Sequence, residues 1–149
     1  MRVTMQNQKD LIAWAEPRMG VEVGRAPPET LALGVLDDDG TIQAVVWFNA
    51  FYANYASMHI ASNNARRWAS RKVLGVIFSF AFHHLKLQRV NAWVSVNNVT
   101  VQVMALKLGF RIEGVARCGA NDGSDAIMLG MLVQDCRWLP SHIREQING

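Results

Sequence analysis

The alternation of apolar and polar residues predicts several strands in the first half of the chain. Residues 31–36 and 41–48 are apolar runs on either side of Asp37-Asp38-Asp39-Gly40, a pattern typical of a β-hairpin whose glycine has a positive φ. Residues 54–62 are expected to form a third strand with two different faces. One face would carry Ala56, Met58 and Ile60, and the other would carry Tyr55, Ser57 and His59.

Apolar residues that recur at helical spacing predict three helices. Residues 8–18 carry one stripe, which Pro17 interrupts, and residues 66–85 carry a longer stripe suited to packing on a sheet. Residues 99–108 form the third stripe, and Gly109 follows in the position of a C-terminal cap. A strand over residues 89–96 and a closing hairpin over 110–117 and 126–133 complete the pattern. This order predicts an α/β (α+β) fold, a mixed sheet with helices packed on it, in a single domain over residues 1–149.

Composition narrows the classes of protein. The chain has 149 residues, of which 50% are hydrophobic and 18% charged, as in a folded globular protein. The longest apolar run, residues 73–82, is shorter than the roughly 20 residues of a membrane-spanning helix. Cys118 and Cys136 have no metal-ligand spacing. We therefore expect a cytoplasmic protein with no metal ion and no membrane partner. The net charge of +3 is small for a nucleic-acid-binding protein.

Three blocks of the second half carry a family resemblance. They are FAFHHLKLQRV (80–90), NNVTVQVMALKLGFRIEGVAR (97–117) and SDAIMLGM (124–131). In the second block Asn98 precedes the helix, Lys107-Leu108-Gly109-Phe110 ends it, and Glu113-Gly114-x-x-Arg117 follows. In register, these blocks resemble the GCN5-related N-acetyltransferase (GNAT) superfamily, and most of all its ribosomal-protein N-terminal acetyltransferases and small phage or prophage members. The resemblance implies a mostly antiparallel sheet with splayed central strands and helices on both faces.

The resemblance also implies a binding site for acetyl-CoA. The family's phosphate-binding motif, Gln/Arg-x-x-Gly-x-Gly/Ala, falls on residues 65–70, where a loop enters a helix. Backbone N–H groups and the helix dipole suit a pyrophosphate there. The implied cofactor-binding residues of this segment are Arg66, Arg67, Trp68, Ala69, Ser70 and Arg71. Ala65 and Trp68 depart from the motif, so the indole must point away from the phosphates or the local conformation must differ.

The resemblance further places the pantetheine arm along Met58, Ile60 and Ala61, where a backbone N–H would polarise the thioester carbonyl. Asn98 would contact the cofactor or cap its helix. A general base is harder to identify, because residues 41–110 contain no Asp or Glu. His59 is the best candidate, and Ser57 on the same strand face could relay a proton through water. Relatives often have a tyrosine that acts as the general acid and protonates the leaving thiolate, and the matching position here is Ala105.

These residues support one function over two alternatives. The main hypothesis is an acetyl-CoA-dependent N-acetyltransferase that acts on a primary amine, with a protein N-terminus or lysine ahead of a small metabolite. A non-catalytic acyl-CoA-binding or protein-interaction module is the alternative. The basic stretch Arg66-Arg67-Trp68-Ala69-Ser70-Arg71-Lys72 also suggests a nucleic-acid binder, but it has too few charges and aromatic residues, so no nucleic-acid partner is expected. The sequence leaves open whether the chain forms a homodimer.

Overall fold

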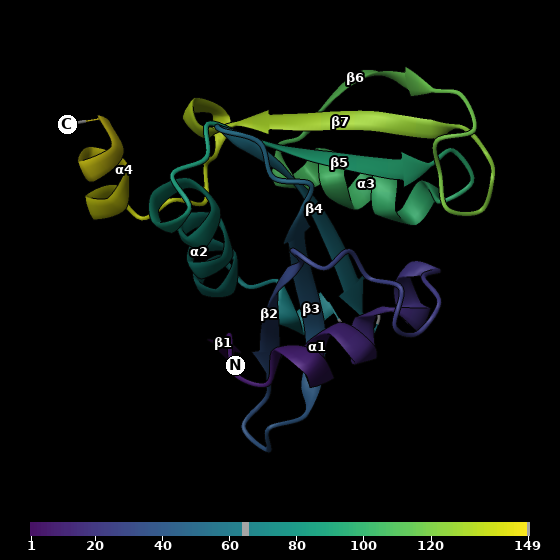
Figure 1. Cartoon of the computed structure of the whole chain (residues 1–149). Coiled ribbons are helices and arrows are strands. Elements are labelled where there is room, and N and C mark those ends of the chain that lie inside the picture. The colour runs from purple at the N-terminus through teal and green to yellow at the C-terminus, as the bar shows by residue number, and fades with distance from the viewer. Residues whose placement is uncertain (64–65, 149) are drawn as a thin grey trace.

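The computed structural model describes residues 1–63 and 66–148, which form seven strands and four α-helices with short turns of 3₁₀-helix between some of them (Figure 1). The strands are β1 (Arg2–Thr4), β2 (Leu31–Leu36), β3 (Ile42–Asn49), β4 (Tyr55–Ser62), β5 (Arg89–Ser95), β6 (Arg111–Ala116) and β7 (Ala126–Leu132). The helices are α1 (Gln8–Ala15), α2 (Arg71–Ser79), α3 (Val99–Leu108) and α4 (Ser141–Asn148). The 3₁₀ turns are η1 (Pro17–Met19), η2 (Arg66–Trp68) and η4 (Val133–Asp135).

All strands belong to one sheet with the order β1-β2-β3-β4-β5-β7-β6. Every neighbouring pair is antiparallel except β4 and β5, which are parallel. These two strands pair only from Tyr55–Ser57 to Arg89–Asn91 and then separate. In Figure 1, β4 runs down beside β3 while β5 continues beside β7, so the sheet divides into two arms. The predicted mixed sheet with splayed central strands is confirmed.

Helices cover both faces of the β2–β4 arm. Alternate residues on its strands enter two separate apolar clusters, as the alternation of Trp47 and Phe48 illustrates. The first cluster joins Trp47 to Leu11 and Ala15 of α1. Gly34 on β2 lets α1 come close, because a Cβ at this position would lie 2.5 Å from a methyl carbon of Leu11. The second cluster, which contains Phe48, receives side chains from α2 and α3.

The helix expected over residues 66–85 is interrupted in the structure. Residues 66–68 form the separate turn η2, and α2 begins only at Arg71. Ser70 explains the start, because its hydroxyl accepts a hydrogen bond from the Val73 N–H at 3.2 Å and caps the new helix. The far end widens into a π-helical turn, η3 (Phe80–His84). The long apolar stripe therefore predicted the helix correctly but not its first turn.

Two elements have no counterpart in the sequence prediction. β1 adds three residues to the edge of the sheet, with Arg2 opposite Leu36, and is too short for alternation to be visible. α4 lies at the C-terminal end and contains no fully buried residue. The other strand boundaries agree with the prediction to within one residue. None of the helices in the described residues combines the length and apolar character needed to cross a bilayer.

Candidate functional site

The division of the sheet exposes backbone groups on β4. The Asn63 N–H donates to the Gln43 carbonyl at 3.1 Å, which identifies one hydrogen-bonded pair between β3 and β4. Hydrogen-bonded and non-hydrogen-bonded pairs alternate in antiparallel strands, so His59 and Ala61 also direct their backbone groups toward β3. The N–H and C=O of Ile60 consequently point the other way, toward the β5 side.

The same reasoning applies to β5. The Val96 N–H donates to the Asp125 carbonyl at 2.9 Å, so the even-numbered residues of β5 bond β7 and the odd-numbered ones face β4. Trp93 is odd-numbered and lies beyond the paired part of the two strands. Within the described residues, the backbone groups of Ile60 and Trp93 therefore face the gap with no ladder partner on the opposite strand.

A cleft of about 1030 Å³ occupies this gap and is lined from both faces of the sheet. On the α1 face the lining side chains are Trp47, Asn49, Ser57 and His59. Around β5 and α3 they include Ala92, Val94, Met104 and Leu108. Since the two groups belong to opposite faces, the cleft offers two entrances that meet where β4 and β5 part. Two reactants could enter from opposite faces and meet there.

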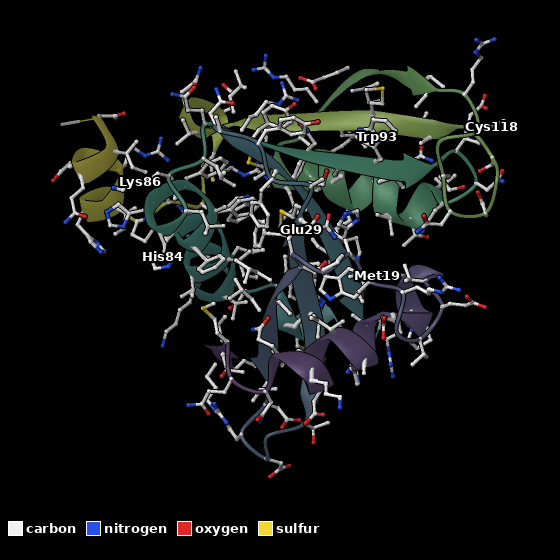
Figure 2. All side chains as sticks on the ribbon, viewed as in Figure 1. Met19, Glu29, His84, Lys86, Trp93 and Cys118 are labelled. Atoms are coloured by element: carbon white, nitrogen blue, oxygen red, sulfur yellow. The ribbon has the colours of Figure 1, made fainter. Side chains whose placement is uncertain are left out.

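Two loops close over the α1-face entrance. Met19 ends η1 and Gly20 and Val21 follow it, and residues 119–122 belong to the β6–β7 loop. The Asn121 side-chain amide donates to the Met19 carbonyl at 3.3 Å and joins the two loops. Figure 2 shows Met19 below the β5–β7 arm and Cys118 at the outer end of the β6–β7 loop. The entrance is therefore framed by segments that are distant in sequence.

The two predicted catalytic residues, Ser57 and His59, lie on the same face of β4, and both line the cleft. His59 Nε2 lies 3.1 Å from Asn49 Oδ1, and Asn49 Nδ2 donates to Thr30 Oγ1 at 3.2 Å. Burial lowers the pKa of His59 below its ordinary value of 6.5, because the interior disfavours the imidazolium. His59 is therefore held as a neutral imidazole near pH 7, the form in which it can accept a proton.

The predicted cofactor residues on β4 divide between two positions. Met58 and Ile60 line the cleft, whereas Ala61 is buried in the cluster beneath α1. Asn98 caps α3 as expected, because its side chain accepts a hydrogen bond from the Val101 N–H at 3.2 Å. It also lines the cleft, and its contact with a cofactor stays a prediction. Ala105, which stands in place of the family's tyrosine, is another lining residue.

Trp68 points into the protein. It is 3% exposed and belongs to the cluster that contains the buried side chains of α2. The indole therefore points away from the surface of this segment, as one of the two alternatives from the sequence required. Ala65 and the side chain of Arg66 lie outside the described residues. Ser70 uses its hydroxyl to cap α2.

The basic residues of this segment lie beyond the cleft. Arg67 is exposed, and the guanidinium of Arg71 approaches the Arg137 carbonyl at 3.5 Å and the Trp138 ring at 6.0 Å. None of residues 67–71 lines the cleft. Arg137 and Trp138, which border this region, were not predicted as site residues, and only the basic-aromatic pair itself could have suggested them. Arg137 also stacks on Trp138 at 4.6 Å.

Few charged groups line the cleft. Among the described lining residues, Arg18 and Asp122 carry full charges near pH 7. The Arg18 guanidinium stacks on Trp14 at 3.7 Å. Hydrogen bonds from Ser124, first from its side chain and then from its backbone, and from Ser95 lower the pKa of Asp122 to about 2. No group of three His, Cys, Asp or Glu side chains that could hold a metal ion occurs in residues 1–63 and 66–148.

Known structures of similar shape are acetyltransferases. A proposed ribosomal-protein-serine acetyltransferase from Vibrio cholerae is 25% identical, with a TM-score of 0.60 over 70% of this chain and 64% of its own. A spermidine/spermine N-acetyltransferase from Vibrio cholerae is 14% identical, with a TM-score of 0.70 over 89% of this chain and 95% of its own. A spermidine N-acetyltransferase chimera from Vibrio cholerae and hSSAT is 17% identical, with a TM-score of 0.61 over 69% and 66% of the two chains.

These matches show the fold. This chain spans slightly less than two thirds of the length of the ribosomal-protein-serine acetyltransferase and of the spermidine N-acetyltransferase chimera. No family model matches the sequence, and no curated protein matches it in sequence. The seven-stranded, mostly antiparallel sheet and its helices nevertheless have the arrangement of the GNAT acetyltransferases. The chain has the GNAT fold.

Proposed function

We propose that this chain, with its GNAT fold, transfers the acetyl group of acetyl-CoA to a primary amine. The observation that carries the proposal is the cleft between β4 and β5, which is lined from both faces of the sheet. A thioester and an amine that enter from opposite faces would meet beside Ile60 and His59. Holding two reactants together in this way is itself a large source of rate enhancement.

Acetyl-CoA would enter on the α3 face. Its pantetheine arm would extend along Met58 and Ile60, and the Ile60 N–H would donate to the thioester carbonyl as negative charge develops on the oxygen. Its pyrophosphate would lie at the N-terminus of α2, where the first backbone N–H groups have no partner within the helix. Arg67 and Arg71 would add charge to this end.

The chemistry requires a neutral amine. His59 would take one proton from the substrate ammonium, and the amine lone pair would then attack the thioester carbonyl carbon. A C–N bond forms and the C–S bond breaks, which yields the N-acetyl product. The second amine proton leaves with the thiolate, so that free CoA is released as a thiol. Ala105 provides no acid for this last step, but a thiol with an ordinary pKa near 8.5 is a tolerable leaving group.

The charge of the cleft favours a peptide amine over a polyamine. A polyamine carries several positive charges and is best matched by several carboxylates. The described lining residues offer only Asp122, which already accepts hydrogen bonds from Ser95 and Ser124, and the positive Arg18. We therefore propose a protein N-terminus or a lysine side chain as the acceptor.

Calorimetry and a thiol-release assay would test this function. We expect saturable acetyl-CoA binding that Arg67→Glu and Arg71→Glu weaken, whereas Lys9→Glu on the exposed surface of α1 leaves it unchanged. Thiol release should then depend on the amine, with N-terminal peptides and lysine peptides ahead of spermidine. An absence of binding at millimolar acetyl-CoA would exclude the function. Turnover of spermidine alone would exclude the proposed acceptor class.

Two observations favour the alternative, a non-catalytic module that binds acyl-CoA or a protein partner. Position 105 carries an alanine that reaches the cleft, and β4 carries no carboxylate. Binding of acetyl-CoA without turnover across the same amines would select this alternative. Both functions therefore predict acetyl-CoA binding in the calorimetry, and only the enzyme predicts thiol release that depends on an amine.

A further inference from the structure

Three side chains on the α1 face form a short hydrogen-bonded chain that ends in the cleft. It runs from Thr30, which is 7% exposed, through Asn49, which is 5% exposed, to His59. Thr30 precedes β2, Asn49 ends β3, and His59 lies in the middle of β4. The chain thus crosses three neighbouring segments, and two of its three members are buried away from water.

The donor and acceptor roles in this chain follow from its atoms. The amide nitrogen of Asn49 donates to the hydroxyl of Thr30 at 3.2 Å, which turns the amide oxygen toward His59. An amide oxygen can only accept, so Nε2 of His59, 3.1 Å away, must carry the hydrogen. In a neutral imidazole the other nitrogen, Nδ1, then has the free lone pair.

Nothing else in the described residues satisfies Nδ1. The hydrogen bond to Asn49 uses Nε2 of the His59 ring. The ring itself packs edge-to-face against Trp47, with the two ring centroids 6.4 Å apart. The neighbouring indole N–H of Trp47 is buried and has no partner within the described residues. Because buried polar groups are nearly always paired, this N–H marks a place next to the His59 ring where a ligand's polar atom can bind.

We propose that Asn49, oriented by Thr30, is a positioning residue that holds His59 in the Nε2–H tautomer, so that Nδ1 is the atom that takes the proton from the substrate ammonium. The inference rests on the proposed acetyl transfer for its catalytic part. The tautomer itself is a property of the unliganded protein. Neither Asn49 nor Thr30 carries any of the family motifs, and only the pairing of β3 with β4 brings Asn49 beside His59.

Other titratable groups lie on the elements packed around the same histidine. They are Arg18 of η1, Asp122 of the β6–β7 loop, Glu29 before β2 and Tyr55 on β4 itself. Arg18 is engaged with the Trp14 ring and carbonyl, Asp122 with two serines, and Glu29 with the Ala50 N–H at 3.2 Å. These three groups have partners of their own, and the neutral amide of Asn49 is the polar group that contacts the ring directly.

The first experiment measures the tautomer without any substrate. Long-range ¹H–¹⁵N spectra of the unliganded protein, with the His59 signals assigned from His59→Gln, should show a protonated Nε2 and an unprotonated Nδ1. Asn49→Leu, which keeps the approximate size but removes the acceptor, should produce a mixture of tautomers. His84→Asn is the control, because His84 lies in η3 and does not line the cleft, and it should leave the His59 signals unchanged. Figure 2 shows His84 on the opposite side of the molecule from Cys118. A protonated Nδ1 in the original protein would overturn the inference.

The second experiment measures the pH profile of kcat. His59→Gln should lower kcat about 100-fold or more, because a positioned general base contributes about 10²- to 10⁴-fold. Asn49→Leu leaves the base in place but unpositioned and should lower kcat less, by about 10-fold. Asn49→Asp retains an acceptor for Nε2–H and adds a negative charge, so it should restore most of the activity and move the acidic limb of the profile to higher pH. An unmoved limb, or equal losses in Asn49→Leu and Asn49→Asp, would reduce Asn49 to a structural role.

The two experiments separate the two proposals. If the tautomer is as described but no amine is acetylated, the proposed function fails and the geometry of His59 stands. If turnover is normal and the tautomer is Nδ1–H, the function stands and the positioning role of Asn49 fails. Thr30→Val, which removes the partner of the Asn49 amide nitrogen, should give an intermediate mixture of tautomers.

Discussion

Replacing Trp68 by alanine should destabilise the protein strongly, because the indole is a core residue. It is 3% exposed and packs in the cluster formed with α2. A tryptophan buries about 200 Å², which at about 25 cal/mol per Å² corresponds to about 5 kcal/mol. A compact unfolded chain reduces this value, and measured losses for buried aromatic residues are about 3 to 5 kcal/mol. We expect a loss in that range, a large part of the stability of a small domain.

Urea unfolding followed by circular dichroism would measure this loss. Trp93→Ala is the matched control, because Trp93 is 48% exposed and this variant should lose only about half as much, roughly 2 to 3 kcal/mol on the same area scale. A loss for Trp68→Ala no greater than that for Trp93→Ala would refute the core assignment. Trp68→Phe should remain folded and bind acetyl-CoA with unchanged affinity. Weaker binding by this variant would instead mean that the indole contacts the cofactor.

Three further predictions concern α3 and the β6–β7 loop. Gly109→Ala should lose about 1 to 2 kcal/mol of unfolding free energy, since Gly109 caps α3 with φ 112°, a region that side chains disfavour; an unchanged urea midpoint would contradict this. Asn98→Ala should lose about 1 kcal/mol and Asn98→Ser should recover most of it, because the side chain caps the Val101 N–H; equal losses in both variants would exclude a capping role. Asp122 has a pKa of about 2 against an ordinary 3.8, so its contribution to the free energy of unfolding is present above pH 3.8 and disappears as the pH falls toward 2. The stability difference between the original protein and Asp122→Asn should shrink over that interval, and a constant difference would contradict the prediction.

The local pattern of the sequence predicted most of the elements. An apolar run beside a turn marked β2 and alternation marked β4. Helical spacing with Gly109 marked α3, with the glycine in the left-handed region as expected. The pattern failed where a single polar contact decided the outcome. α2 starts at Arg71, five residues later than the apolar stripe suggests, because the Ser70 hydroxyl accepts from the Val73 N–H and caps the helix there. β1 was missed because three residues are too few to show a period.

The candidate site could be predicted only in part. Ser57, Met58, His59 and Ile60 were expected on β4, and the structure has all four lining the cleft. Asn98 was expected either as a cap or at the cofactor, and its position allows both. Asn49 and Thr30 carried no recognisable motif. Their relation to His59 depends on strand register, which pairs residues far apart in the sequence.

By itself, the sequence determined which segments form strands and helices and which fold they resemble, because hydrophobic period and turn residues act over a few neighbours. The tertiary structure decided how those segments meet. It turned Trp68 into the core and separated β4 from β5 after three paired residues. It also placed the Asn49 amide against His59. These outcomes depend on packing and register across the whole sheet, where the free energy of each contact is set by residues distant along the chain.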